Sequence, residues 1–425
     1  MKERLIVQNI GPISDVDIEI NKVNIYIGPQ SIGKSTLAKV ISFCAWLEKN
    51  ILMNQGTSHI DKDFLRQNLL VYHKLTSFFN ASSYIEYSSA LISFSFHSLN
   101  DFKIAVVGDM KRTDMRKITY IPAERNIISI PNISTLSLEN NYIRDFIFDW
   151  LLIHGKFTNE YQIELLGIGG SYSFDTNKGD IITLEDGKEI PLNQSSSGLQ
   201  SVVPLLVFLA YGADWIFHNE PDLSFDNFNS LQKSILKSLS KDEELEAKVF
   251  EAAIKTPAIN QALGNIYHFA RHHSSEIEAN EGMKEIRDLV NHIGKPHSSF
   301  FVIEEPEENL FPSTQYELVK HIFRMLDNGN DNKLVITTHS PYIMTSINNL
   351  IQCQTVLEES NTTKEELERV MNTRSFISYE DIDALAFDNG RLVSIKDDEF
   401  RLISAESLDS ASDKISRDFE RLLDL

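Results

Sequence analysis

The stretch that decides the fold is Gly28-Pro29-Gln30-Ser31-Ile32-Gly33-Lys34-Ser35-Thr36, which fits the phosphate-loop pattern G-x-x-x-x-G-K-[ST] without a departure. Residues 23–27 before it alternate between apolar and polar and then become apolar, as a strand entering a buried sheet does. After it, apolar residues recur at helical spacing, namely Leu37, Val40, Ile41 and Ala45. A loop between strand and helix can direct backbone N–H groups and the positive end of the helix dipole at phosphate oxygens. The sequence therefore predicts a nucleoside triphosphate site.

Each part of this loop has an expected role. Lys34 is expected to reach the β- and γ-phosphates, and the Ser35 hydroxyl is expected to hold Mg²⁺. The remaining loop residues are expected to surround the phosphates; they are Gly28, Gln30, Ser31, Gly33 and Thr36. A chance match in a turn rich in glycine and serine is the alternative, and it leaves the flanking strand and helix unexplained.

The composition limits the classes of protein that this chain can represent. A hydrophobic content of 42% and a charged content of 24% are typical of a soluble globular protein. The net charge of −21 disfavours broad, non-specific wrapping of DNA or RNA, because phosphate neutralisation by basic residues supplies most of that affinity. Basic residues between 103 and 117 leave a local nucleic-acid contact open, although a solvated hairpin tip explains them equally well.

Three features favour a cytoplasmic protein without a membrane anchor. The N-terminal residues lead directly into a strand-like segment and do not resemble a signal peptide. The longest apolar run, residues 202–211, is interrupted by Pro204 and is too short to span a bilayer. Both cysteines, Cys44 and Cys353, lie in apolar stretches, which favours buried thiols in a reducing compartment.

The patterns along the chain predict an α/β fold, with a mixed sheet core, an antiparallel β lobe and a helical insertion. Strands are expected at residues 5–10, 17–21, 23–27, 118–121, 171–174, 181–184, 300–303 and 333–337, with antiparallel strands over 83–107 and a hairpin over 385–394. Helices are expected from the phosphate loop to about 54, within 56–80, at 138–154 and 199–211, and at the end of the chain. We expect residues 1–212 and 298–425 to form one head, and residues 213–297 to form the insertion.

A second motif supplies paired carboxylates. Four apolar residues, 300–303, run directly into Glu304-Glu305-Pro306-Glu307. At the end of such a strand one carboxylate can face the Mg²⁺ ion and the next can face the water that attacks the γ-phosphate. We therefore expect Glu304 to bind the metal and Glu305 to polarise the water. A strand followed by a solvated acidic turn is the alternative.

Two further motifs follow the same chain order. The apolar strand 333–337 leads to His339, which could hydrogen-bond the γ-phosphate, although a lone histidine is usually structural. Residues 195–201 place serines and Gly198 at the start of an apolar helix, which is ordinary N-capping chemistry. Such a helix terminus is also a second anion site, which one nucleotide can use only if that site belongs to a neighbouring copy.

This order of motifs resembles the ATP-binding-cassette type of ATPase head, in the AAA-family branch of chromosome-maintenance, recombination and overcoming-lysogenisation-defect proteins. The resemblance implies ATP and Mg²⁺ as cofactors, ATP hydrolysis, and a homodimer that encloses the nucleotide. It implies that Ser197, Gly198 and Gln200 form the signature motif that contacts the γ-phosphate of the opposite subunit. It implies that Glu305 is the catalytic glutamate and His339 the switch histidine. The stretch 307–312 matches the segment that crosses the dimer interface.

The chain departs from the family pattern at several positions. Glu304 stands where aspartate is usual, and Leu199 replaces the second glycine of the signature; either change could slow hydrolysis. Phe311 stands where close relatives tend to have histidine. The glutamine loop should fall at residues 123–126, but no glutamine is there; Arg125 is one candidate for its place, and a salt bridge at a strand end explains that residue equally well.

The segments Tyr-Ile-Pro-Ala-Glu-Arg and Ser-Ser-Gly-x-Gln resemble those of ATPases in bacterial anti-phage systems of the Septu and retron-linked types. This resemblance implies a sensor or switch for a separate effector, such as a nuclease or a toxin, with residues 213–297 docking the partner or extending the dimer. One alternative is a DNA-repair or chromosome-maintenance ATPase that binds DNA directly. Another is a scaffold that ATP stabilises and that hydrolyses ATP slowly.

Overall fold

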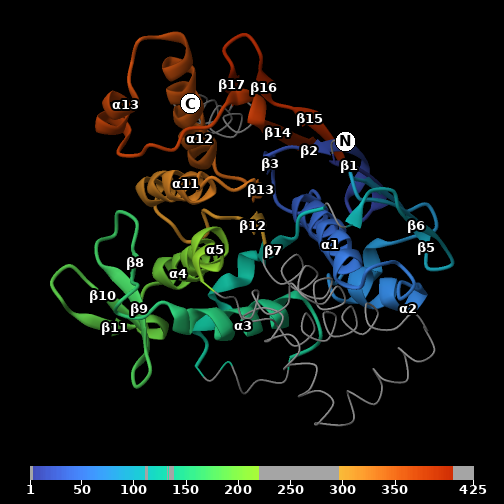
Figure 1. Ribbon diagram of the computed structural model, residues 1–425, viewed down its shortest axis with the longest axis horizontal. Coiled ribbons are helices and arrows are strands. Elements are labelled where there is room, and N and C mark those ends of the chain that lie inside the picture. The colour runs from blue at the N-terminus through green and yellow to red at the C-terminus, as the bar shows by residue number, and fades with distance from the viewer. Residues whose placement is uncertain (1–2, 111–112, 132, 134–137, 220–295, 405–425) are drawn as a thin grey trace, which may run out of the picture.

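The computed structural model describes residues 3–110, 113–131, 133, 138–219 and 296–404. Most of the expected insertion, residues 220–295, and the expected C-terminal helix, within residues 405–425, lie outside the described residues. The head that remains is one large sheet with helices on both faces and two small separate sheets (Figure 1).

The large sheet has eleven strands in the order β6-β5-β4-β1-β2-β15-β14-β3-β13-β12-β7. Five neighbouring strands run parallel: β14 (Ile382–Asp388), β3 (Val23–Ile27), β13 (Lys333–Thr338), β12 (Ser298–Glu304) and β7 (Arg116–Ile121). The others pair antiparallel with their neighbours, except that β15 and β2 run parallel: β1 (Glu3–Ile10), β2 (Ile13–Ile20), β4 (Tyr84–Ser88), β5 (Ile92–Ser98), β6 (Asp101–Val106) and β15 (Arg391–Ser394). The α/β class, with its mixed core and antiparallel lobe, is confirmed.

Side chains along the central strands point alternately to the two faces of the sheet, so the core has two layers. In β12, Phe300 and Val302 join the cluster around helix α1 (Lys34–Met53), whereas Phe301 and Ile303 join the cluster on the opposite face. That opposite face is covered by α3 (Tyr142–Ile153), α4 (Ser197–Ala210), α11 (Pro312–Leu326) and α12 (Pro341–Glu359). Because both faces are covered, β3, β12 and β13 are buried almost throughout, and each has an apolar centre.

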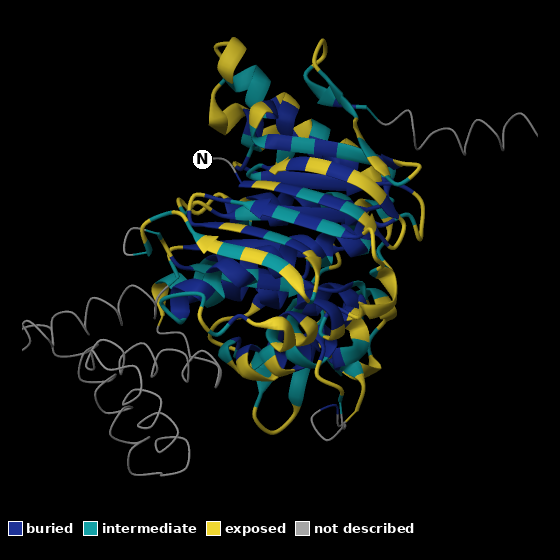
Figure 2. Cartoon of the chain, turned by 90° about the vertical axis from the view of Figure 1, so that its right-hand side faces the viewer, coloured by how far each residue is buried: buried dark blue, intermediate teal, exposed yellow. Residues whose placement is uncertain are grey.

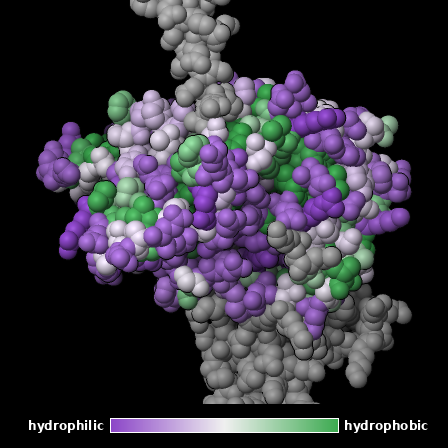
Figure 3. All heavy atoms as spheres, turned by 90° about the horizontal axis from the view of Figure 1, so that it is seen from above, coloured by the Kyte–Doolittle hydropathy of each residue, from purple (hydrophilic) through white to green (hydrophobic). Residues whose placement is uncertain are grey.

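Smaller elements complete the head. A four-stranded sheet lies beside α4 and consists of β8 (Ile163–Glu164), β9 (Ser171–Asp175), β10 (Gly179–Thr183) and β11 (Glu189–Pro191). The helices α2 (Lys62–Leu65) and α13 (Lys364–Met371) and the hairpin of β16 (Lys396–Asp397) and β17 (Leu402–Ile403) lie at the periphery. Buried and exposed residues alternate along several strands of the large sheet (Figure 2), and the face seen in Figure 3 is mainly hydrophilic with separate hydrophobic patches.

The helix that starts at Ser197 differs in length from the sequence expectation. It continues from α4 through a π-helical turn, Tyr211–Trp215, into α5 (Ile216–His218). The expected boundary between residues 212 and 213 therefore lies inside a continuous helix. This helix, Ser197–His218, has the length and hydropathy of a membrane span, but 83% of its apolar window is buried inside the molecule, as in the core helix of a soluble protein.

Residues 56–80 are less helical than expected. They contain only α2, a π-helical turn at Arg66–Val71 and a short 3-10 turn at Thr76–Phe78. Gly56 has a φ of 148°, and Lys74 has a φ of 56°, so left-handed backbone conformations bound the helical turns on both sides. Helical spacing of side chains did not reveal these interruptions.

Candidate functional site

The phosphate loop connects β3 to α1, as the sequence predicts. Gly28 has a φ of 144° and Gly33 a φ of 114°, conformations that side chains rarely adopt. A Cβ atom on Gly28 would lie 2.3 Å from Cδ1 of Ile32, so a side chain at this position would also clash. Gln30 and Ser31 are exposed, whereas Gly33, Lys34 and Thr36 are buried.

Lys34 is held by its own loop. Its Nζ atom donates hydrogen bonds to the carbonyl oxygens of Gly28 and Pro29, both at 2.7 Å. Burial lowers the pKa of this ammonium group, while the nearby carboxylates of Glu305, Glu307 and Glu304 act in the opposite direction. The Lys34 ammonium group therefore bonds its own loop and lies near the carboxylates at and after the end of β12.

Ser35 and Glu304 come together, as expected for a pair that binds one metal ion. Glu304, at the end of β12, accepts hydrogen bonds from the Ser35 hydroxyl and from the hydroxyl of Tyr120. Burial raises the pKa of the Glu304 carboxyl, whereas these hydrogen bonds and the charge of Lys39 oppose the rise. A carboxylate beside a hydroxyl is the hard-oxygen donor set that Mg²⁺ prefers, so these residues fit the ion. The extra methylene of Glu304 does not prevent this contact.

The structure also brings Glu305 and His339 together. Nδ1 of His339 lies 3.6 Å from Oε1 of Glu305, and both side chains are partly exposed. Glu305 has a φ of 43°, a left-handed conformation that is unusual for a residue with a side chain, and its N–H donates to the Thr337 carbonyl at 2.8 Å. The end of β12 is thus tied to the end of β13, directly before His339.

Glu307 has a structural role that the sequence did not predict. Its buried Oε1 atom accepts hydrogen bonds from the Thr338 hydroxyl at 2.7 Å and from the His339 N–H at 2.8 Å. Ser340 then caps α12 and donates a hydrogen bond to Gln315 at 2.6 Å. The segment that carries His339 is therefore fixed by the turn that follows β12 and by α11.

The predicted signature residues lie at the start of α4. Ser196 is the N-cap, and Ser197 beside it is exposed. A Cβ atom on Gly198 would lie 2.9 Å from the Asn309 carbonyl oxygen, so the helix start packs closely on the segment after β12. Gln200 donates hydrogen bonds to the Ser195 and Asn193 carbonyls, at 2.9 and 3.4 Å. Within the described part of the chain, no hydrogen bond or ion pair joins Ser197, Gly198 or Gln200 to the phosphate loop.

Arg125 is completely buried where a glutamine loop was expected. Its guanidinium group donates to the carbonyl oxygens of Ser201, Glu304 and Glu305, at 3.0, 3.0 and 2.9 Å. The nearest paired carboxylate, that of Glu308, lies 3.9 Å away. A simple salt bridge at a strand end therefore does not describe this residue. Sequence reasoning had no signal for these contacts, nor for that of Tyr120 with Glu304, because they join segments that lie far apart in the chain.

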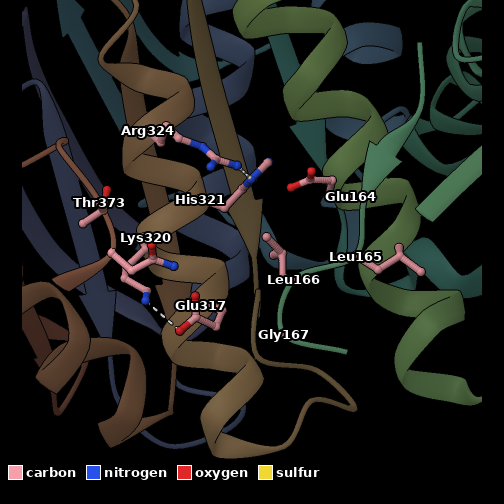
Figure 4. A pocket seen from close by; sticks show the side chains of 10 residues that line it. Glu164, Leu165, Leu166, Gly167, Glu317, Lys320, His321, Arg324 and Thr373 are labelled. Carbon is pink, nitrogen blue, oxygen red and sulfur yellow. Dashed lines mark hydrogen bonds and ion pairs between the residues drawn. The ribbon is translucent and has the colours of Figure 1, made fainter. Parts of the chain in front are cut away.

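A separate cavity of about 190 Å³ lies between α11 and the β8 turn (Figure 4). Its lining includes Glu164, Glu317, Lys320, His321 and Arg324, with Arg324 directed at His321. Burial lowers the pKa of His321 to about 3, so its imidazole is neutral. None of the predicted nucleotide-site residues lines this cavity.

Comparison with known proteins identifies one domain model. The model described as "AAA ATPase domain" matches residues 287–344, a segment that contains Glu304, Glu305 and His339. The expected enzyme class, an ATPase, is confirmed by this match. Among curated proteins, none matches the chain.

Several solved structures are similar over most of the chain. The SMC head domain from Thermotoga maritima is 11% identical, with a TM-score of 0.39, and the match covers 93% of this chain and 100% of that one. The recombination mediator protein RecF is 12% identical, with a TM-score of 0.29 and coverages of 93% and 97%. The ADP conformation of an ATP-binding cassette from an ABC transporter is 12% identical, with a TM-score of 0.25 and coverages of 92% and 90%.

Proposed function

We propose that the chain binds ATP with Mg²⁺ at Gly28–Thr36 and hydrolyses it between two copies of the head. The observation that carries the proposal is the meeting of the predicted residues at the carboxyl ends of three adjacent parallel strands. The phosphate loop follows β3, Glu304 ends β12 and Glu305 comes directly after it, and His339 follows β13. In sheets of this type, ligands bind at the carboxyl ends of the strands.

Each residue has a defined part in the proposed hydrolysis. Lys34 exchanges its bonds to the loop carbonyls for bonds to the β- and γ-phosphates. Ser35 and Glu304 hold Mg²⁺, which neutralises charge on the phosphate oxygens when bound. Glu305 orients the attacking water and accepts its proton while the new bond to the γ-phosphorus forms. The bond from that phosphorus to the bridging oxygen breaks, and ADP and phosphate leave.

The nucleotide is proposed to lie between two heads because, among the described residues, no hydrogen bond or ion pair joins the expected signature residues to the phosphate loop of the same chain. Ser197 is exposed at a helix N-terminus, which favours an anion. Phe311, in the adjoining segment, is 75% exposed, one of the most exposed large apolar side chains in the described part of the chain. A second copy would bring Ser197, Gly198 and Gln200 to the γ-phosphate and cover Phe311.

Glu305→Gln tests the proposed chemistry. The amide keeps the size of the side chain but cannot accept a proton, so kcat for ATP should fall at least about a hundredfold while ATP affinity stays near that of the wild type. A dimer with bound ATP should accumulate, which size-exclusion chromatography with light scattering measures. Wild-type turnover by Glu305→Gln would contradict the proposed role.

We further propose that this ATP cycle controls a separate effector, in keeping with the resemblance to ATPases of anti-phage systems. All the motifs identified in the chain belong to the ATPase head. Copurification from the native operon, with and without ATP, should recover one additional protein whose retention depends on nucleotide. Recovery of DNA in place of a protein would favour the DNA-binding alternative.

A further inference from the structure

We propose that Arg125 is a positioning residue for ATP hydrolysis: it fixes the backbone turn that carries Glu304 and Glu305 and ties this turn to the first turns of α4. The inference rests on the proposed function, because it assigns to Arg125 the placement of Glu305. Among the described contacts, Arg125 forms no ion pair with the carboxylate of Glu304 or of Glu305. Its contacts are with backbone carbonyl groups.

The hydrogen bonds of the guanidinium group use its full donor capacity. Arginine has five N–H donors in a rigid planar fork. The structure pairs them with five carbonyl oxygens, those of Pro122, Ser201, Glu304, Glu305 and Pro306. Three of these carbonyls are consecutive in the chain and surround Glu305. No other common side chain can bond this set at once.

The turn that Arg125 holds is a strained one. Glu305 has a φ of 43°, and a residue with a side chain stays in this conformation only when its surroundings fix it. The Glu305 N–H is already bonded to the Thr337 carbonyl. Arg125 fixes the other side of the same residue through the Glu304 and Glu305 carbonyls. Together, these bonds determine where the Glu305 carboxylate lies.

The burial of a charge here also indicates a specific role. The Arg125 side chain is fully buried, and burial lowers the pKa of its guanidinium group, although nearby carboxylates, that of Glu308 first, oppose this. Burying a cation is costly unless its partners compensate. Apolar residues would fill the same space at a lower cost in desolvation. The polar group is needed because only a donor can hold the carbonyls.

The bond to Ser201 extends the role to the signature helix. Ser201 lies one helical turn after Ser197, and its carbonyl accepts a hydrogen bond from Nε of Arg125 at 3.0 Å. The start of α4 and the Glu305 turn are therefore joined through one rigid group. A displacement of either element would misplace the guanidinium group relative to the other.

Arg125→Lys tests this inference. A lysine keeps the positive charge, but its three donors cannot bond five carbonyls. Because small misplacements of reacting groups have large effects on rate, we expect kcat to fall about tenfold to a hundredfold. KM for ATP, and the affinity measured with a fluorescent ATP analogue, should change less than about threefold. Arg116→Lys, at the start of β7, the strand that precedes Arg125, is the matched control and should keep wild-type kcat.

A double-mutant cycle separates positioning from a general loss of stability. If Arg125 acts through Glu305, Arg125→Lys should have no further effect on kcat in the Glu305→Gln background. Arg125→Met keeps an unbranched side chain of similar length but has no donor for the carbonyls, so it should lose kcat at least as far as Arg125→Lys. This second variant keeps the inference testable even if Arg125→Lys does not fold.

The outcomes distinguish the inference from the proposed function. If the wild type does not hydrolyse ATP, or if Glu305→Gln keeps its activity, the proposed function fails and the inference fails with it. If Glu305→Gln loses activity but Arg125→Lys retains kcat, or if the two effects add, only the inference is overturned. Wild-type kcat in Arg125→Met would overturn it as well, because the bonds to the carbonyls would then not be needed.

Discussion

At the scale of single residues, the charge of Glu304 depends on the few groups that contact its carboxylate. Burial raises its pKa, and the hydroxyls of Tyr120 and Ser35 and the charge of Lys39 oppose this effect. A carboxylate binds Mg²⁺ only when it is ionised. The hydrogen bond from Tyr120 would therefore support the proposed metal site without contributing a ligand.

We predict that Tyr120→Phe weakens Mg²⁺ binding in a pH-dependent way. The bond from the Tyr120 hydroxyl favours the charged form of Glu304, so its loss raises the pKa of this carboxyl further. The acidic limb of the activity profile should move to higher pH, and the Mg²⁺ concentration for half-maximal activity should rise about threefold to tenfold near neutral pH. Titrations of ATP turnover with Mg²⁺ at several pH values measure both effects. An unchanged pH profile would show that Tyr120 does not set the charge of Glu304.

At the scale of elements, the sequence predicted the strands and helices with strong periodicity and missed the contacts between them. The phosphate loop, β12 and β13 follow from local patterns, because each is an apolar strand next to a short motif. The bond between Tyr120 and Glu304 joins residues that are 184 positions apart, and it depends on the pairing of β7 with β12. A single sequence does not reveal such a register, so the partners of Glu304 and Arg125 were not predictable.

The turn after β12 and the start of α12 form one unit because Glu307 joins them. We predict that Glu307→Ala lowers the free energy of unfolding by about 2–4 kcal/mol, since it leaves two buried donors, from Thr338 and His339, without an acceptor. Glu307→Gln keeps an oxygen acceptor at the same place and should cost about 1 kcal/mol or less. Urea denaturation measures both values. Equal losses in the two variants would contradict the assigned hydrogen bonds.

At the scale of the whole molecule, the proposed active site needs two copies of the chain. Lys34 and Ser197 would then belong to the same site only when they come from different subunits. Substitution of either residue disables both sites of a dimer made from one variant. In a mixed dimer, both defects fall in one site and the other site is intact.

We therefore predict that Lys34→Ala and Ser197→Arg complement each other. Each variant alone should lack ATP turnover, whereas an equal mixture should recover roughly a quarter of wild-type turnover, since about half of randomly formed dimers are mixed and each holds one intact site. Measurement of phosphate release after mixing and re-equilibration tests this. The matched control mixes Lys34→Ala with Glu305→Gln: both residues serve the nucleotide site of their own subunit, so a mixed dimer carries one defect in each site and should show no recovery. Recovery in the control as well would contradict the shared site.

The order of strands has a consequence for how the protein is made. β3, which carries the phosphate loop, lies between β13 and β14, and the Asn24 side chain donates a hydrogen bond to the Leu334 carbonyl 310 positions later. During synthesis β3 emerges early, but both of its neighbours emerge late. At roughly 5–20 residues per second, translation leaves this strand without partners for at least about 15 seconds. The nascent chain must therefore keep an apolar strand from aggregating until the ribosome has delivered β14.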